Sequence, residues 1–152
     1  MILRRATAHD AQAVAIVHRT AMRVSLSFLP ELHTAEQDLA YFRDSFLPAN
    51  EVWVVEEGGR VVGYVGFDAD WIHHLYLLPE AQGQGIGPLL LAKAMADGRA
   101  RRLWTFQQNL RARKFYEDRG FVAVEFTDGA GNEEKTPDVC YEWRPDRTCP
   151  GV

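Results

Sequence analysis

The chain has 152 residues, about the length of one domain, and its 47% apolar and 25% charged residues are ordinary for a protein with a packed core. The net charge of −4 argues against a nucleic-acid-binding protein, and no apolar run approaches the length of a membrane span. Because the first ten residues also lack the apolar core of a signal peptide, we expect a cytoplasmic protein with neither nucleic acid nor membrane as a partner.

In chain order, the first elements expected are a strand and a helix. The strand spans residues 2–5 and is followed by Thr7, which has the position of a helix cap, with Asp10 in the place of a capping-box acid. The apolar residues of the helix recur at helical spacing, at Val14, Val17, Ala21 and Val24.

A second helix and a hairpin follow. The helix is expected over residues 34–46 and is again opened by a threonine. The segments EVWVVEE at 51–57 and VVGYVGF at 61–67 have strand composition, and the Gly-Gly turn between them predicts a β-hairpin.

The second half alternates between strands and helices. Strands are expected at 71–78, 101–107, 121–126 and 139–143, and helices at 88–96 and 109–119. The whole order, β-α-α-β-β-β-α-β-α-β-β, predicts an α/β or layered α+β fold, in which helices cover the faces of a mixed sheet. We expect residues 1–145 to form a single domain and residues 146–152 a C-terminal tail.

The two cysteines, Cys140 and Cys149, form no CxxC pair and have no Cys/His spacing typical of a metal site. Cys140 lies in an apolar strand pattern and is expected in the core, whereas Cys149 lies in the tail TCPGV and is expected to be exposed. We therefore expect reduced thiols and no metal.

The most informative segment is EAQGQGIGPLLL at residues 80–91, where Gly83, Gly85 and Gly87 alternate and Pro88 follows. Glycines between a strand and a helix allow positive φ angles and close approach, and the helix start offers free N–H groups to an anion such as phosphate. Proline fits the first helical turn, so Gly87 is expected near the N-cap. A tight turn without a ligand is the alternative.

Two common nucleotide motifs do not match this segment. The dinucleotide fingerprint GxGxxG requires glycine where Pro88 stands, and an acidic residue near position 103 is missing. The P-loop ends in Gly-Lys-Ser/Thr, whereas this segment continues Gly87-Pro88-Leu89.

Instead, QGQGIG at residues 82–87 resembles the acyl-CoA signature Q/R-x-x-G-x-G/A of the GNAT superfamily of N-acetyltransferases. NLRARKFYEDRGF at residues 109–121 is similar to a second motif of that superfamily, N-x-x-A-x-x-F-Y-x-x-x-G-F, and LYLLPE at 75–80 to a third, LYVxPE. The motifs occur in the family's order. Pro88 is a departure, because the family more often has a small or basic residue there.

The resemblance implies a mixed, mostly antiparallel twisted sheet of about seven strands flanked by about four helices. It also implies acetyl-CoA as co-substrate, transfer of the acetyl group to a primary amine of a small molecule or peptide, and direct attack in a ternary complex. Tyr116 is then the expected general acid beside the CoA sulfur, while Phe115 also has a core interpretation. The residues expected to contact the co-substrate are Leu77, Leu78, Gln82, Gly83, Gln84, Gly85, Ile86, Gly87, Pro88, Asn109, Ala112, Phe115 and Tyr116.

The proton acceptor is less defined. His73 and His74 lie on the strand that leads to the glycine segment, and side chains of adjacent strand residues point to opposite faces. We expect His73 to be the catalytic one because it shares parity with Leu75 and Leu77, although a hydrogen-bonded structural histidine, a carboxylate or a water chain are alternatives. For acceptor binding, the expected residues are Phe28, His33 and His74, with Glu36 and Tyr41 as weaker candidates.

Other interpretations stay open. A catalytically silent module that binds or senses acyl-CoA would keep the glycines without needing the acid, and a plain structural domain would bind no CoA. Arg99, Arg101, Arg102, Arg111 and Arg113 are placed to meet a CoA phosphate, but a solvated surface is the preferred interpretation. A homodimer is also possible, with the last strand as an exposed edge.

Overall fold

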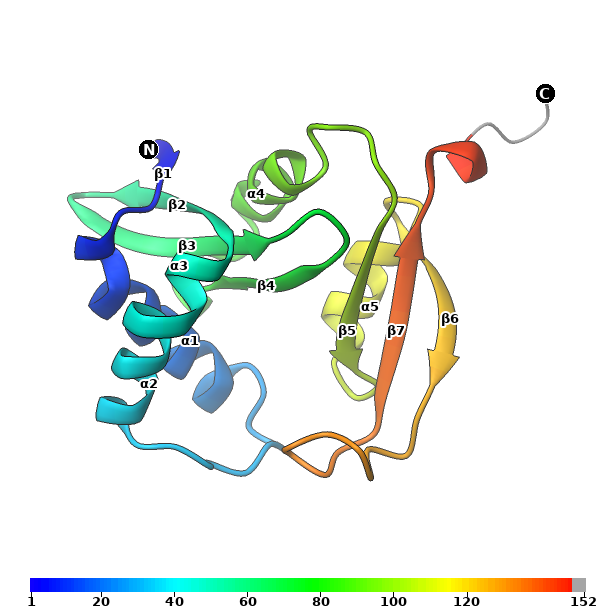
Figure 1. Ribbon diagram of the computed structural model, residues 1–152, viewed down its shortest axis with the longest axis horizontal. Helices are drawn as coiled ribbons and strands as arrows, with labels where there is room; N and C mark the ends of the chain where they lie inside the picture. Colours follow the sequence, from blue (N-terminus) through cyan, green and yellow to red (C-terminus); the bar gives the residue numbers. More distant parts are fainter. Residues whose placement is uncertain (149–152) are drawn as a thin grey trace. The chain divides into compact units, whose positions relative to one another are not determined.

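The computed structural model describes residues 1–148, and the expectation for Cys149 lies outside this part of the chain (Figure 1). The described chain forms two compact units. The first contains Met1–Asp68 and Ile72–Ala96, and the second contains Ala69–Trp71 together with the residues from 97 onward. The predicted order of strands and helices is confirmed, so the chain has the expected layered α/β architecture.

The first unit is built on a four-stranded antiparallel sheet in the order β1-β2-β3-β4 (Figure 1). The strands are β1 (Ile2–Arg5), β2 (Glu51–Glu57), β3 (Arg60–Phe67) and β4 (Ile72–Leu77). The predicted hairpin is confirmed between β2 and β3. β-Branched valines supply most of its buried positions, which is the composition a covered strand needs.

Helices cover both faces of this sheet. On one face lie α1 (Ala11–Val24) and α2 (Ala35–Tyr41), and α2 continues through a π-helical turn at Phe42–Phe46 into α3 (Leu47–Ala49). Gly66 of β3 allows this layer to approach closely, because a Cβ atom there would lie 2.3 Å from the Phe46 ring. On the other face α4 (Ile86–Ala94) packs against β2, β3 and β4.

The predicted caps of the first two helices are present. Thr34 receives a hydrogen bond from the Gln37 N–H at 3.1 Å and donates its own N–H to the Gln37 side chain at 2.8 Å. At the start of α1 the Asp10 carboxylate accepts the N–H of Thr7 at 2.7 Å. α2 therefore begins directly after Thr34, as predicted, whereas the Thr7 cap opens a 3-10 turn at Ala8–Asp10 and α1 itself begins three residues later, at Ala11.

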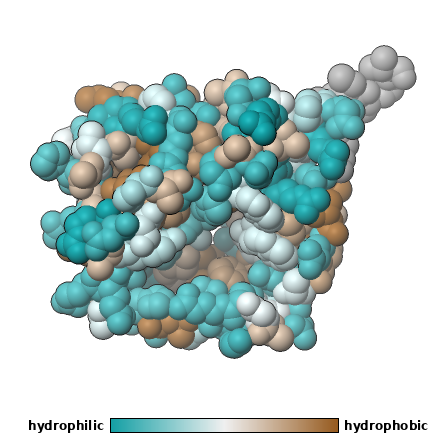
Figure 2. All heavy atoms as spheres, viewed as in Figure 1, coloured by the Kyte–Doolittle hydropathy of each residue, from teal (hydrophilic) through white to brown (hydrophobic). Residues whose placement is uncertain are grey.

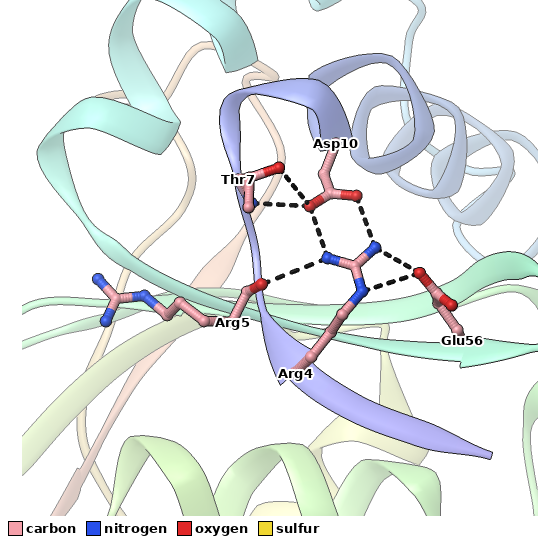
Figure 3. Close-up of polar contacts among 5 residues, drawn as sticks. All are labelled: Arg4, Arg5, Thr7, Asp10 and Glu56. Carbon is pink, nitrogen blue, oxygen red and sulfur yellow. Dashed lines mark hydrogen bonds and ion pairs between the residues drawn. The ribbon is translucent and has the colours of Figure 1, made fainter.

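The Asp10 carboxylate also anchors the edge strand β1 (Figure 3). The Arg4 guanidinium donates to both of its oxygens at 2.9 Å and to Glu56 of β2 at 2.8 Å. Arg4 thereby lowers the pKa of the buried Asp10 carboxyl, and the two carboxylates raise the pKa of Arg4. One bidentate network thus links β1, β2 and the start of α1.

The second unit contains a three-stranded antiparallel sheet, β5 (Arg101–Phe106), β6 (Val122–Phe126) and β7 (Asp138–Trp143), with α5 (Leu110–Glu117) between β5 and β6 in the chain. The strand order is β5-β7-β6, so the last strand is central. The expectation that it offers an exposed edge is therefore wrong, since β5 and β6 occupy both of its sides. Cys140 on β7 is buried, as expected.

The seven expected strands thus occur as two sheets rather than one, and each sheet is antiparallel throughout. The face seen in Figure 2 is covered mainly by hydrophilic side chains, with hydrophobic ones in scattered small groups. Among residues 1–148, no helix has the length and apolar character needed to cross a membrane.

Candidate functional site

The glycine segment forms the turn from β4 into α4, in the first unit. A short 3-10 turn at Pro79–Ala81 follows the strand, and Gly83 and Gly85 then take φ angles of +78° and +80°. No heavy atom lies within 4 Å of the position that a Cβ atom would occupy at either glycine. Crowding therefore does not explain these two glycines, whereas the left-handed backbone and the open space beside it do.

The helix begins two residues earlier than predicted. Its N-cap is Gly85 rather than Gly87, and Ile86 is its first residue. Since Gly85 already takes the left-handed conformation that ends the loop, Ile86 and Gly87 join the first turn. Pro88 still lies within that turn, where its missing N–H removes no intrahelical hydrogen bond.

This helix start suits an anion. The N-cap has no side chain, so no side-chain oxygen takes the first N–H groups of α4. These donors lie at the positive end of the helix dipole, beside the open side of two glycines. Such a helix start can hold an anion such as a phosphate group.

The residues around the loop brace it. The Gln84 side chain donates to the Glu80 carbonyl at 3.0 Å, and Gln82 lies 3.4 Å from the Ser25 hydroxyl. Leu77 pairs with Gly63 in the sheet. Leu78 donates its N–H to the Val62 carbonyl at 2.8 Å and accepts from Ala81 at 2.9 Å, so its backbone groups are engaged within the chain.

The second predicted motif forms α5, in the second unit. Asn109 is its N-cap, and its side-chain oxygen accepts the Ala112 N–H at 3.2 Å. Tyr116 is 7% exposed and packs edge-on against Phe115 and Phe121. Phe115 is only half-buried, with the Arg119 guanidinium 4.0 Å above its ring.

The adjacent histidines of β4 lie in different surroundings. Ile72 pairs with Phe67 and His74 with Gly66, which makes His73 the extra residue of a β-bulge. The parity argument for His73 assumed unbroken alternation and does not apply at a bulge. His73 is exposed, and its Nε2 lies 2.7 Å from the Asp68 carboxylate.

His74, in contrast, packs within a cluster of aromatic rings. Its Nδ1 lies 2.9 Å from the Tyr64 hydroxyl, and its ring stacks on Phe46 at 4.4 Å and on His18 at 5.1 Å. Burial lowers the pKa of His74 well below its ordinary range and that of His18 to about 4. Both imidazoles are therefore neutral near pH 7.

His18 was not identified from the sequence. It belongs to the same helical stripe as Val14, Val17 and Ala21, and a polar residue on that stripe was the available signal. We use the name histidine stack for Phe46, His74 and His18, whose rings lie roughly parallel in that order.

Of the predicted acceptor residues, His74 lies on β4 in the histidine stack, and the others lie on or next to the first helices. Phe28 and His33 belong to the segment between α1 and α2, where Arg19 donates to the His33 carbonyl at 3.0 Å. Glu36 is exposed on the first turn of α2. Tyr41 is also exposed, and its ring contacts Phe42 and Phe46, the second of which belongs to the histidine stack.

The arginines of the second unit mostly have protein partners. Arg101 is buried and paired with Asp97 at 2.9 Å, which differs from the solvated position expected. Arg102 pairs with Glu142 at 2.8 Å, and Arg113 donates to the Tyr141 hydroxyl at 3.0 Å. Arg99 and Arg111 are exposed, in line with the surface interpretation.

Comparison with known proteins gives consistent results. Residues 19–121 match the model of the Acetyltransferase (GNAT) family. An uncharacterized N-acetyltransferase of Archaeoglobus fulgidus is 35% identical over 98 residues, which cover 54% of this chain and 66% of that protein, just under two thirds. The peptidyl-lysine N-acetyltransferase YjaB of Salmonella typhimurium is 27% identical over 78% of this chain and 81% of its own.

A solved structure shows the same fold. The structure of yncA from Salmonella typhimurium with its cofactor acetyl-CoA superposes with a TM-score of 0.72 over 96% of this chain and 94% of that one. The sequence identity is 21%, so this likeness concerns the fold.

Proposed function

The chain belongs to the acetyltransferase (GNAT) family, and on this basis we propose that it is an N-acetyltransferase that transfers the acetyl group of acetyl-CoA to a primary amine. The observation that carries the proposal is the start of α4, where Gly83 and Gly85 have left-handed backbones with open space beside them. A family match over residues 19–121 includes this loop. The acceptor amine belongs to a small molecule or a peptide.

The proposed reaction needs no covalent enzyme intermediate. The ammonium form of the acceptor first loses one proton to water or to a base. The neutral amine then attacks the thioester carbon, a C–N bond forms and the C–S bond breaks. The nitrogen gives up a second proton, the CoA sulfur takes one, and the products are an amide, the free thiol and one released proton.

The residues of this chain have separate roles in the proposal. The N–H groups at residues 83–87 hold the pyrophosphate, and the braces at Gln82 and Gln84 keep the loop in shape. Tyr116 gives its proton to the departing sulfur, a role that rests on the sequence motif. Asn109, Ala112 and Phe115 line the pantetheine arm, Asn109 in addition to capping α5.

The proposal also covers the base and the extent of the domain. His73, polarised by Asp68 at 2.7 Å, or a water beside it takes the proton of the amine. Residues 1–145 are proposed to act as one catalytic domain, because the family match spans residues 19–121.

Calorimetric titration with acetyl-CoA tests the proposal. Gly85→Glu places a carboxylate on the open side of the loop, where it repels the pyrophosphate, and we expect binding to fall at least 100-fold. Gly59→Glu is the matched control, because Gly59 has a φ of +81° and the same open surroundings in the hairpin turn. Equal losses in both variants, or no binding by the unmodified protein, would contradict the proposal.

Tyr116→Phe separates an enzyme from a silent acyl-CoA-binding module. The enzyme should keep its affinity for acetyl-CoA and lose thiol release by about 100-fold, within the range for general acid catalysis. A sensing module would release no thiol with any amine, before or after the substitution.

A further inference from the structure

Tyr141 has a buried hydroxyl in the second unit. The residue lies on the central strand β7, and its side chain is fully buried. Its hydroxyl donates to the Glu117 carboxylate at 2.5 Å and accepts from the Arg113 Nε at 3.0 Å. The direction of both bonds is fixed, because a guanidinium only donates and a carboxylate only accepts. One hydroxyl of β7 therefore joins two charged residues of α5.

Packing alone does not explain this hydroxyl. A phenylalanine would fill nearly the same volume without a polar group, and a buried polar group is unfavourable unless it is hydrogen-bonded. Burial and the hydrogen bond with Glu117 raise the pKa of Tyr141, so the phenol keeps its proton near pH 7. The hydroxyl is thus a fixed contact at two points of α5 rather than a group that titrates.

α5 has little apolar surface with which to hold its orientation. The helix is described over all of its eight residues, and among these Tyr116 is the one that is buried. Isolated helices shorter than about 12 residues are marginal in water, so the position of this helix depends on its contacts. Asn109 caps its first turn by accepting the Ala112 N–H at 3.2 Å. The bonds of Tyr141 hold the rest of the helix.

The two partners of Tyr141 hold α5 against rotation. Arg113 and Glu117 are four residues apart and so lie one turn apart on the same side of the helix. Tyr116 directly precedes the second of them. Its ring has little freedom of its own, because it packs edge-on against Phe121 at 5.4 Å and lies 6.5 Å from the Tyr141 ring. The direction of the Tyr116 hydroxyl therefore follows the rotation of the helix.

Arg113 is held from a second direction as well. Its guanidinium also donates to the Gln107 carbonyl at 3.2 Å, directly after the end of β5. The Gln107 side chain in turn donates to the carbonyls of Thr127 and Asp138 at 2.8 and 3.0 Å, which joins the ends of β6 and β7. The contact with Tyr141 thus connects α5 to a rigid end of the second sheet.

Resting on the proposed acetyl transfer, we propose that Tyr141 is a positioning residue, whose hydroxyl fixes the rotation of α5 at which the Tyr116 proton reaches the departing sulfur. A general acid must lie within hydrogen-bond reach of the atom that it protonates. A displacement of about 1 Å can lower a rate about 100-fold, so the rotation of a short helix is sufficient to matter. The Tyr116 phenolate regains its proton through water from the second proton of the nitrogen.

Steady-state kinetics of thiol release by the full chain test this inference, with acetyl-CoA and Nα-acetyl-lysine amide as the probe amine. Tyr141→Phe removes only the hydroxyl, and we expect kcat to fall about tenfold. The KM for acetyl-CoA should stay nearly unchanged, because the loop at residues 82–87 belongs to the other unit. In a Tyr116→Phe background the same substitution should leave kcat nearly unchanged, since no proton is left to position.

Two further variants and a control separate positioning from stability. Glu117→Gln keeps an oxygen that accepts from the Tyr141 hydroxyl and should retain most of kcat, whereas Glu117→Ala should lower kcat as much as Tyr141→Phe does. Arg4→Met is the control, because it breaks the hydrogen bonds that hold β1 in the first unit. It should lower the melting temperature without lowering kcat, measured where all variants are folded.

The outcomes are distinct. An unchanged kcat in Tyr141→Phe, or an equal loss with and without Tyr116, would overturn the inference, as would full activity of Tyr116→Phe. If the protein binds acetyl-CoA but releases no thiol with the probe amine, the proposed function fails instead.

In that case NMR of tyrosines labelled with ¹³C at the phenolic carbon decides separately, with the Tyr116 signal assigned from Tyr116→Phe. A Tyr116 signal that shifts in both Tyr141→Phe and Glu117→Ala, but not in Arg4→Met, supports the inference. An unshifted signal overturns it.

Discussion

The loop at residues 82–87 and the histidine stack belong to the same unit, yet the first is formed by backbone groups and the second by side chains. The loop presents backbone N–H groups, is exposed from Gly83 to Gly85, and has no titratable side chain. The histidine stack presents side chains contributed by α1, the π-helical turn and β4, and its two imidazoles are neutral because they are buried. A backbone site depends on local conformation, whereas a side-chain site depends on packing and on pH.

The largest expected effect of this difference is a loss of folding stability at acidic pH. The pKa of His18 is about 4 in the folded chain and near 6.5 when unfolded, so only the unfolded chain gains the proton between these values. The unfolding free energy is therefore unaffected by His18 above pH 6.5. It decreases as the pH falls from 6.5 toward 4, by about 3 kcal/mol in all. His74 acts in the same direction.

Urea denaturation at pH 7, 6 and 5 measures this loss. In His18→Phe the decrease in unfolding free energy should be clearly smaller than in the unmodified protein. Parallel decreases in the two proteins would show that His18 does not govern the acid response.

A smaller effect is expected from Tyr64→Phe. Removing the hydroxyl leaves the His74 Nδ1 without its hydrogen-bond partner and should lower the unfolding free energy by about 2 kcal/mol. Adding His74→Phe removes the orphaned nitrogen, so the double variant should be less destabilised than the sum of the two single changes. Strict additivity in this cycle would mean that the two groups do not interact.

The smallest effect belongs to the loop. Gly83→Ala meets no atom of the chain, so its cost is the strain of a left-handed alanine, about 1 kcal/mol, with no dependence on pH. Gly131→Ala is the control, because Gly131 has open space without a positive φ. Similar stabilities for the two variants would indicate that the loop relaxes without strain.

The difference between a local backbone site and a site of packed side chains also explains which features the sequence predicted. The glycine loop and the Thr34 cap both appeared as short motifs, since the residues that form them are neighbours in the chain. The helix start was misplaced by two residues because three alternating glycines do not reveal which of them takes the left-handed conformation.

Features that depend on distant residues were not predictable in this way. The stack of His18 on His74 joins residues 56 positions apart. The bulge at His73 is a property of its pairing with β3, and the central position of β7 is a property of the whole second sheet. No local sequence pattern indicates these pairings. The role predicted for His73 rested on the alternation of side chains along a strand, and the edge position predicted for the last strand rested on its place in the chain order.

The position of β7 has a consequence for synthesis on the ribosome. All strands of the first unit have been made once residue 77 is reached, and α4 is complete at residue 94. β5 and β6 both pair with β7 and not with each other, so the second sheet cannot close until residue 143 is in place. At roughly 5–20 residues per second, the unit that carries the glycine loop has several seconds to fold before the second sheet is complete.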